Sequence, residues 1–114
     1  MLSCLGDQIA ALASEERFGS DAVALSIVVD QQSTWKQIME KMPKLADATI
    51  LFDTTRGVSS AYDVLNLPSS MHPGAYPGHT YMVIDKEGII RYVYDDPKMA
   101  IRNDIIVSEV NKLR

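Results

Sequence analysis

Hydrophobic residues recur with helical spacing near both ends of the chain. One face of a first predicted helix carries Leu5, Ile9 and Leu12. Neighbouring alanines favour that helix, and Gly19 is a suitable residue to end it. A closing amphipathic helix is predicted from about Asn103. The apolar face of this closing helix consists of Ile106, Val110 and Leu113.

Two apolar runs between these helices predict strands. Residues 22–30 (AVALSIVVD) are apolar at nearly every position, which is typical of a strand covered on both faces, as in a parallel sheet. Residues 48–53 (ATILFD) predict a second, short strand. Between the two, Thr34 and Gln37 have the spacing of a capping box that opens a helix, and Pro43 is expected to end that helix.

The second half of the chain predicts a short helix, a loop, a hairpin and the closing helix. The short helix is expected near residues 58–65, and residues 66–79 hold three Pro and two Gly, which predicts a loop. Residues 80–95 predict a β-hairpin with Gly88 in its turn. Alternating helices and strands followed by a hairpin and a helix indicate a single α/β domain, residues 1–114, with a mixed sheet.

Composition excludes several classes of protein. The net charge is −4 and no run of Lys or Arg occurs, which argues against nucleic acid and anionic membranes as partners. The longest apolar run is too short to span a bilayer. The single cysteine excludes an internal disulfide. A soluble, cytoplasmic protein is therefore the expectation.

That single cysteine, Cys4, lies at the expected start of the first helix. Free N–H groups and a partial positive charge at a helix N-terminus stabilise a thiolate, which is the nucleophilic form of cysteine. The alternative is that Cys4 is only a small apolar residue near the terminus. Cys4, His72 and His79 lack the compact spacing of metal ligands, so no metal site is predicted.

Three segments resemble a known family. Residues 78–96 (GHTYMVIDKEGIIRYVYDD) carry the most specific match, and residues 24–30 and 43–64 add weaker ones. Together they resemble the peroxiredoxin-like redoxins of the alkyl hydroperoxide reductase and thiol-specific antioxidant type. The resemblance implies a thioredoxin-like α/β/α sandwich with a mixed sheet.

The family resemblance also implies a function and a site. The reactive cysteine of such proteins lies at the N-terminus of the helix to which Cys4 belongs, and His79 falls where they place another active-site residue. Cys4 would reduce a peroxide or a disulfide, an external thiol would regenerate it, and the loop 69–78 would line the site. No cofactor is implied.

One element of that fold is missing from the sequence. The central strand of a thioredoxin-like sheet precedes the helix at which this chain starts, and it would lie between residues 22–30 and 80–85. The chain would then be N-terminally truncated, with unpaired strand edges. We expect either a homodimer, which we prefer, or direct pairing of the two strands. The functional alternative is a redox-inactive thioredoxin-like domain used for binding or assembly.

Two further expectations concern charged residues outside the predicted site. Asp95 and Asp96 precede Pro97, which predicts a solvated turn. Arg56 follows the second strand and is expected to interact with a nearby carboxylate rather than with substrate.

Overall fold

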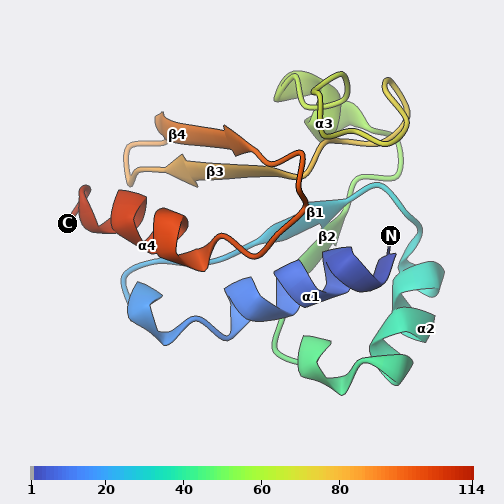
Figure 1. The fold of residues 1–114 in the computed structure, drawn as a ribbon, viewed down its shortest axis with the longest axis horizontal. Helices are drawn as coiled ribbons and strands as arrows, with labels where there is room; N and C mark the ends of the chain where they lie inside the picture. Colours follow the sequence, from blue (N-terminus) through green and yellow to red (C-terminus); the bar gives the residue numbers. More distant parts are fainter. Residues whose placement is uncertain (1) are drawn as a thin grey trace.

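The computed structural model describes residues 2–114, with side chains from Leu5 onward. It contains four α-helices, two short 3₁₀ helices and four strands in those residues (Figure 1). In chain order these are α1 (Leu2–Ala13), η1 (Glu16–Phe18), β1 (Ser26–Val28), α2 (Gln32–Lys41), η2 (Pro43–Leu45), β2 (Ile50–Phe52), α3 (Gly57–Ala61), β3 (Thr80–Ile84), β4 (Ile90–Asp95) and α4 (Asn103–Asn111).

The strands form two separate pairs. β1 and β2 are parallel, with Ser26 opposite Ile50, and β3 and β4 are antiparallel, with Thr80 opposite Asp95. The predicted α/β class with both strand orientations is confirmed. The predicted direct pairing of the first strand with the hairpin is wrong, because β1 and β3 share no ladder in the part of the chain that the structure describes.

Helix α1 connects the two strand pairs. It contacts both of them from one side, since Ile9 belongs to the apolar core under β1 and β2 while Leu12 packs against the core under β3. The first core also buries Val28, Trp35 and Leu45. The second core joins β3 to α4 and η1 through Phe18, Val83, Ile106 and Val107.

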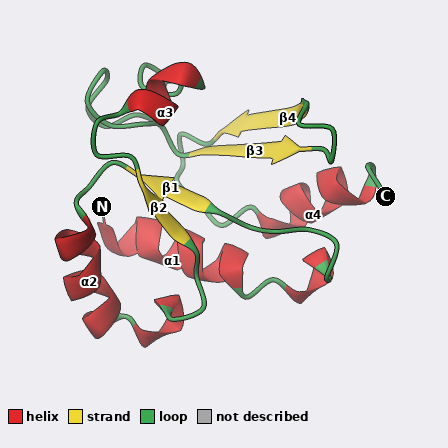
Figure 2. Cartoon of the chain, turned by 180° about the vertical axis from the view of Figure 1, so that it is seen from behind, coloured by secondary structure: helices red, strands yellow, loops and turns green. Residues whose placement is uncertain are grey.

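The helices cover the strands unevenly. In both views α1 and α2 lie on one side of β1 and β2, and the short α3 lies on the other (Figures 1 and 2). Large apolar side chains stay accessible on or next to the strands: Ile27 in β1 is 43% and Leu51 in β2 44% exposed, and Leu25, directly before β1, is 52% exposed. None of the helices in residues 2–114 is long and apolar enough to cross a bilayer.

Local signals in the sequence were confirmed to different degrees. The turn at Gly88 adopts a φ of 84°, which glycine tolerates best, and Pro43 follows Met42, the C-cap residue of α2. The predicted capping box is wrong, because α2 starts earlier, at Gln32, and Gln31 caps it without a side-chain hydrogen bond. The first strand is shorter than the apolar run 22–30, because only Ser26–Val28 find a partner strand.

Candidate functional site

Cys4 lies in the first turn of α1, as the sequence predicts, but its side chain lies outside the described residues. A residue in the first helical turn is close to backbone N–H groups that lack a partner within the helix. Gln8 follows four positions later, so positions 4 and 8 share a face of α1, one turn apart. The contacts of Gln8 therefore show what lies one turn along α1 from Cys4.

Gln8 joins α1 to His79, the second predicted site residue. Although Gln8 is polar, it is only 6% exposed. Its Oε1 lies 2.9 Å from His79 Nδ1, and its Nε2 donates to the Ala100 carbonyl at 2.9 Å. These contacts connect the helix that carries Cys4, the residue before β3, and the segment between β4 and α4. The structure thus places His79 beside Gln8, the residue one helical turn along α1 from position 4.

The Gln8 contacts determine the tautomer of neutral His79. The Ala100 carbonyl can only accept, so the Gln8 amide must direct its NH₂ group toward Ala100 and its oxygen toward His79. That oxygen requires a proton on His79 Nδ1. Nε2 of the neutral ring is then unprotonated and can accept a hydrogen bond or a proton. With this tautomer, Nε2 of His79 is an acceptor rather than a donor.

Burial keeps His79 in this neutral state. Removal of the ring from water lowers the pKa of His79 below its usual 6.5, and the negative charges of Asp96 and Asp95 oppose that shift only in part. Neutral imidazole therefore prevails at and somewhat below neutral pH. In this state the ring can act as a base, which a charged imidazolium cannot do.

The lowered pKa of His79 predicts a pH dependence of stability. The unfolded chain binds a proton at His79 below about pH 6.5, whereas the folded chain binds it only at lower pH. The free energy of unfolding should therefore fall as the pH drops from 6.5 through the folded pKa. Urea titrations of the wild type and His79→Gln should diverge in this range, the wild type losing more stability. Parallel pH profiles of the two proteins would contradict the prediction.

Ser69 and Asp95 hold the backbone of His79 in place. The Ser69 hydroxyl is buried, donates to the Asp95 carboxylate and accepts from the His79 N–H at 2.6 Å. Asp95 also accepts from the Ser69 N–H at 3.1 Å. The end of the loop 66–79 is thereby attached to the last residue of β4.

Asp96 forms a second anchor directly beside the first. It is fully buried, and its carboxylate accepts from the N–H groups of Lys98 and Ala100 and from Arg102, with Nε at 2.8 Å. Arg102 together with these N–H groups lowers the pKa of Asp96 to about 2. The backbone N–H of Asp96 donates to the His79 carbonyl at 2.9 Å. The prediction of a solvated turn at Asp95 and Asp96 is therefore wrong.

The loop 69–78 contributes less to the site than the sequence suggested. Only Pro77 and Gly78 of this loop line the cleft that extends to Gln8 and His79. Among the side chains that the structure describes, Arg56 forms no ion pair with a carboxylate. It donates instead to the Ala75 and Thr54 carbonyls and lies 5.8 Å from the centre of the Tyr76 ring. Arg56, the N-cap residue of α3, therefore links the loop 69–78 to that helix.

Gln8, Ala100 and Asp96 are site residues that sequence reasoning missed. The available signal was one polar residue, Gln8, at a helical position next to the apolar Leu5, Ile9 and Leu12 stripe. The side chains that the structure describes include no group of three or more His, Cys, Asp or Glu able to hold a metal ion.

The profile of the AhpC/TSA family matches residues 7–93 of the chain. The match begins three residues after Cys4, so it includes His79 but not the cysteine. A search among curated protein sequences found no match.

Among solved structures, AhpC of Mycobacterium tuberculosis superposes with a TM-score of 0.74 at 21% sequence identity. The alignment covers 95% of this chain and 60% of that protein, so this chain spans less than two thirds of its relative's length. The similarity confirms the predicted thioredoxin-like fold, and the profile match covers more than half of the sequence. The chain therefore belongs to the AhpC/TSA family.

Proposed function

We propose that this chain is a thiol-dependent redox protein in which Cys4 reduces a peroxide or a disulfide. The observation that carries the proposal is the position of Cys4 in the first turn of α1 in a chain of the AhpC/TSA family. A helix N-terminus favours the thiolate, which attacks peroxides and disulfides. We also propose that residues 1–114 act as one domain.

In the peroxide reaction the Cys4 thiolate attacks one peroxide oxygen and the O–O bond breaks. The sulfur is oxidised to a sulfenic acid, and the other oxygen leaves as an alcohol or water after it takes up a proton. An external thiol then attacks the sulfur, which releases water and forms a mixed disulfide. A second external thiol displaces Cys4 and restores the thiolate. The scheme uses external thiols because residues 1–114 hold one cysteine, Cys4.

His79 is proposed as the hydrogen-bond acceptor of this site. Its Nδ1 proton is held by Gln8, its ring is neutral, and Gln8 shares a helix face with position 4. Nε2 is then the group able to accept the proton that the Cys4 thiol loses. No cofactor or metal takes part in this scheme.

The activities of one cysteine variant and one histidine variant test the proposal. With hydrogen peroxide and dithiothreitol, Cys4→Ser should lower the rate of peroxide consumption at least about 100-fold, because serine is a far weaker nucleophile. His79→Ala should lower it about tenfold, in line with a lost proton acceptor. His72→Ala, a matched change in the exposed loop, should leave the rate unchanged.

The thiol itself provides a second test. Titration of thiolate absorbance should give Cys4 a pKa below about 8.5, the value of an unperturbed thiol. A wild-type rate in Cys4→Ser, or a Cys4 pKa of about 8.5 or more, would reject the redox function for this chain.

A homodimer in the cytoplasm completes the proposal. The accessible apolar side chains on and directly before β1 and on β2, among them Leu25, Ile27 and Leu51, support self-association because large apolar patches on a domain surface favour interfaces. Sedimentation at micromolar concentration distinguishes the dimer from a monomer.

A further inference from the structure

A closed ring of hydrogen bonds joins His79 to the segment between β4 and α4. On the side-chain half of the ring, His79 Nδ1 contacts Gln8 Oε1, and Gln8 Nε2 donates to the Ala100 carbonyl. On the other half, the Ala100 N–H donates to the Asp96 carboxylate, and the Asp96 N–H donates to the His79 carbonyl. Each of these four contacts measures 2.9 Å. The same segment therefore holds both the imidazole and the backbone of His79.

The donors around this ring all point in the same direction. The backbone N–H groups of Asp96 and Ala100 can only donate, and the carbonyls can only accept. Arg102 and the backbone donors lower the pKa of Asp96 to about 2, so its ionised carboxylate can only accept. Gln8 and His79 are the members whose side chains can either donate or accept. The fixed members therefore dictate the orientation of the Gln8 amide and, through it, the position of the His79 proton.

The Ala100 carbonyl is held in place by the 96–102 turn, which connects β4 to α4. Asp96 in this turn is fully buried, and Arg102 contacts both of its carboxylate oxygens, with Nε at 2.8 Å and Nη2 at 3.2 Å. The Tyr81 hydroxyl also donates to the Ala100 carbonyl, at 3.3 Å. That oxygen thus receives two donors, and a reversed Gln8 amide would turn its own oxygen toward it.

Met99, directly before Ala100, adopts a strained backbone conformation. Its φ is 54°, in the left-handed region that residues with a side chain rarely occupy. Its N–H donates to the Asp96 carbonyl at 3.1 Å. Such a conformation persists only where the surrounding contacts enforce it, and it is found most often near functional groups. Here the strained residue lies beside the carbonyl that holds Gln8.

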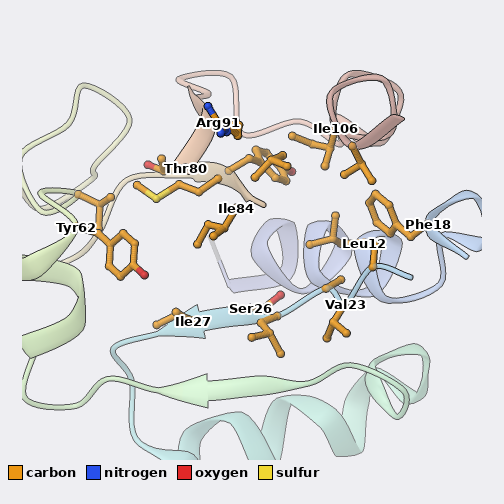
Figure 3. Close-up of a pocket in the computed structure, with 18 of the residues that line it drawn as sticks. Leu12, Phe18, Val23, Ser26, Ile27, Tyr62, Thr80, Ile84, Arg91 and Ile106 are labelled. Carbon is orange, nitrogen blue, oxygen red and sulfur yellow. The ribbon is translucent and has the colours of Figure 1, made fainter. Parts of the chain in front are cut away.

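The two adjustable side chains of the ring, Gln8 and His79, line the cleft that Figure 3 shows. Thr80, the residue after His79, and Leu12, one helical turn beyond Gln8, are among the labelled side chains of its lining. The ring therefore presents its functional groups to the cleft, while the 96–102 turn holds them from behind.

We propose that the 96–102 turn is the positioning element of His79. It holds the Ala100 carbonyl against Gln8, and Gln8 keeps the imidazole proton on Nδ1 and leaves Nε2 as the accepting nitrogen. Asp96 and Arg102 are positioning residues, because they act on the imidazole through Ala100 and Gln8. The benefit of this tautomer for Cys4 rests on the proposed function, whereas the tautomer itself does not.

Nitrogen NMR of the imidazole ring measures the tautomer directly. The chain has two histidines, so every protein in this experiment carries His72→Ala, and the remaining signal belongs to His79. Above the pKa of His79, this reference protein should carry the proton on Nδ1. Gln8→Met keeps the length of the side chain but removes both of its hydrogen bonds. It should lower the ratio of Nδ1–H to Nε2–H at least about fivefold.

Substitutions at Asp96 and Arg102 test the turn. Asp96→Asn keeps the size of the side chain but replaces one accepting oxygen by a donor, so it should lower the ratio at least about threefold. Arg102→Lys keeps both charges but cannot contact both carboxylate oxygens, so it separates geometry from charge and should lower the ratio about twofold. It also serves where Asp96→Asn does not fold. Asp104→Asn makes the same change in a side chain that is 90% exposed and pairs with Arg17, and it should leave the ratio unchanged.

Peroxide consumption tests whether this positioning reaches Cys4. Gln8→Met should lower the rate about fivefold in the reference protein, because His79 then loses its fixed accepting nitrogen. It should have no further effect in His79→Ala, since Gln8 acts through His79. If the reference protein consumes no peroxide, the proposed function fails, and the NMR ratios alone decide the role of the turn.

Three results would overturn the proposal. The first is a neutral His79 in the reference protein with its proton on Nε2. The second is a ratio that stays unchanged in folded Asp96→Asn and Arg102→Lys, or that falls equally in Asp104→Asn. The third is a rate loss from Gln8→Met that persists undiminished in His79→Ala, because Gln8 would then act by another route.

Discussion

Replacing Asp96 by alanine should lower the free energy of unfolding by about 3 kcal/mol, because it leaves a buried network without its central acceptor. The carboxylate is fully buried and accepts from two backbone N–H groups and from the Arg102 guanidinium. Removing it leaves these partly buried donors without their acceptor. Thermal unfolding should shift down by roughly 10 °C or more for a domain of this size.

Asp104 offers the matched control for Asp96. It also pairs with an arginine, Arg17, at 2.8 Å, but its side chain is 90% exposed. Exposed ion pairs contribute little, so Asp104→Ala should cost less than about 1 kcal/mol. Equal losses from the two substitutions would show that burial of Asp96 is not what stabilises the fold.

Acid should erase the difference between wild type and Asp96→Ala. The pKa of Asp96 is about 2 in the fold and about 3.9 in an unfolded chain, so its contribution is complete above about pH 4 and is lost as the pH falls toward 2. Urea titrations of both proteins across this range measure the convergence. A constant difference down to pH 2 would contradict the role of the ionised carboxylate.

Local patterns predicted most of the elements of this fold. The hairpin turn at Gly88, the closing helix from Asn103 and the irregular loop 66–79 all follow from short-range signals, namely a glycine turn, a helical apolar stripe and a cluster of Pro and Gly. Such signals are contained in a few consecutive residues. They are therefore visible in a single sequence.

Long-range arrangement could not be predicted in the same way. The run 22–30 is apolar enough for a fully buried strand, but pairing depends on which strand lies beside it. Only Ser26–Val28 pair, and they pair on one edge, because no other strand within residues 2–114 lies beside the second edge. The apolar pattern of a strand predicts its burial, but its pairing partner depends on the tertiary arrangement.

In the candidate site, too, local features were predicted and long-range contacts were not. Cys4 and His79 were predicted as site residues from helix position and family resemblance. These two grounds require no knowledge of side-chain contacts. Gln8 was missed because its role arises from a contact with His79, which is 71 residues away in sequence. Asp95 and Asp96 were misjudged because an acidic pair before a proline usually faces solvent. Here the pair meets Ser69, Arg102 and a row of backbone donors instead.

Replacing Gly78 by alanine should lower the free energy of unfolding by about 3 kcal/mol, because a methyl group cannot fit where the loop meets β4. An added Cβ would lie 2.5 Å from Ser69 Oγ, 2.8 Å from Asp95 Oδ1 and 3.2 Å from Leu67 Cβ. The Ser69 hydroxyl is already engaged by Asp95 and by the His79 N–H. The new methyl group must break these hydrogen bonds or displace the loop. Urea titration measures the loss.

Gly57→Ala is the control for this substitution. A Cβ at Gly57 would meet only Thr55 Oγ1, at 3.7 Å, and Gly57 begins helix α3, where alanine is favoured. The control should leave stability unchanged or raise it slightly. If Gly78→Ala were as stable as Gly57→Ala, the loop would not be held against β4 as closely as its contacts imply.

A double substitution separates steric overlap from loss of hydrogen bonds at Gly78. Ser69→Ala alone removes the hydroxyl that bridges Asp95 and His79, so it should be destabilising by itself. It also removes the atom nearest to the new methyl group. Combined with Gly78→Ala, the total loss should therefore be smaller than the sum of the two single losses, by about 1 kcal/mol or more. Additive losses would mean that the methyl group disturbs Asp95 or Leu67 rather than Ser69, and that the bond from Ser69 to His79 survives in Gly78→Ala.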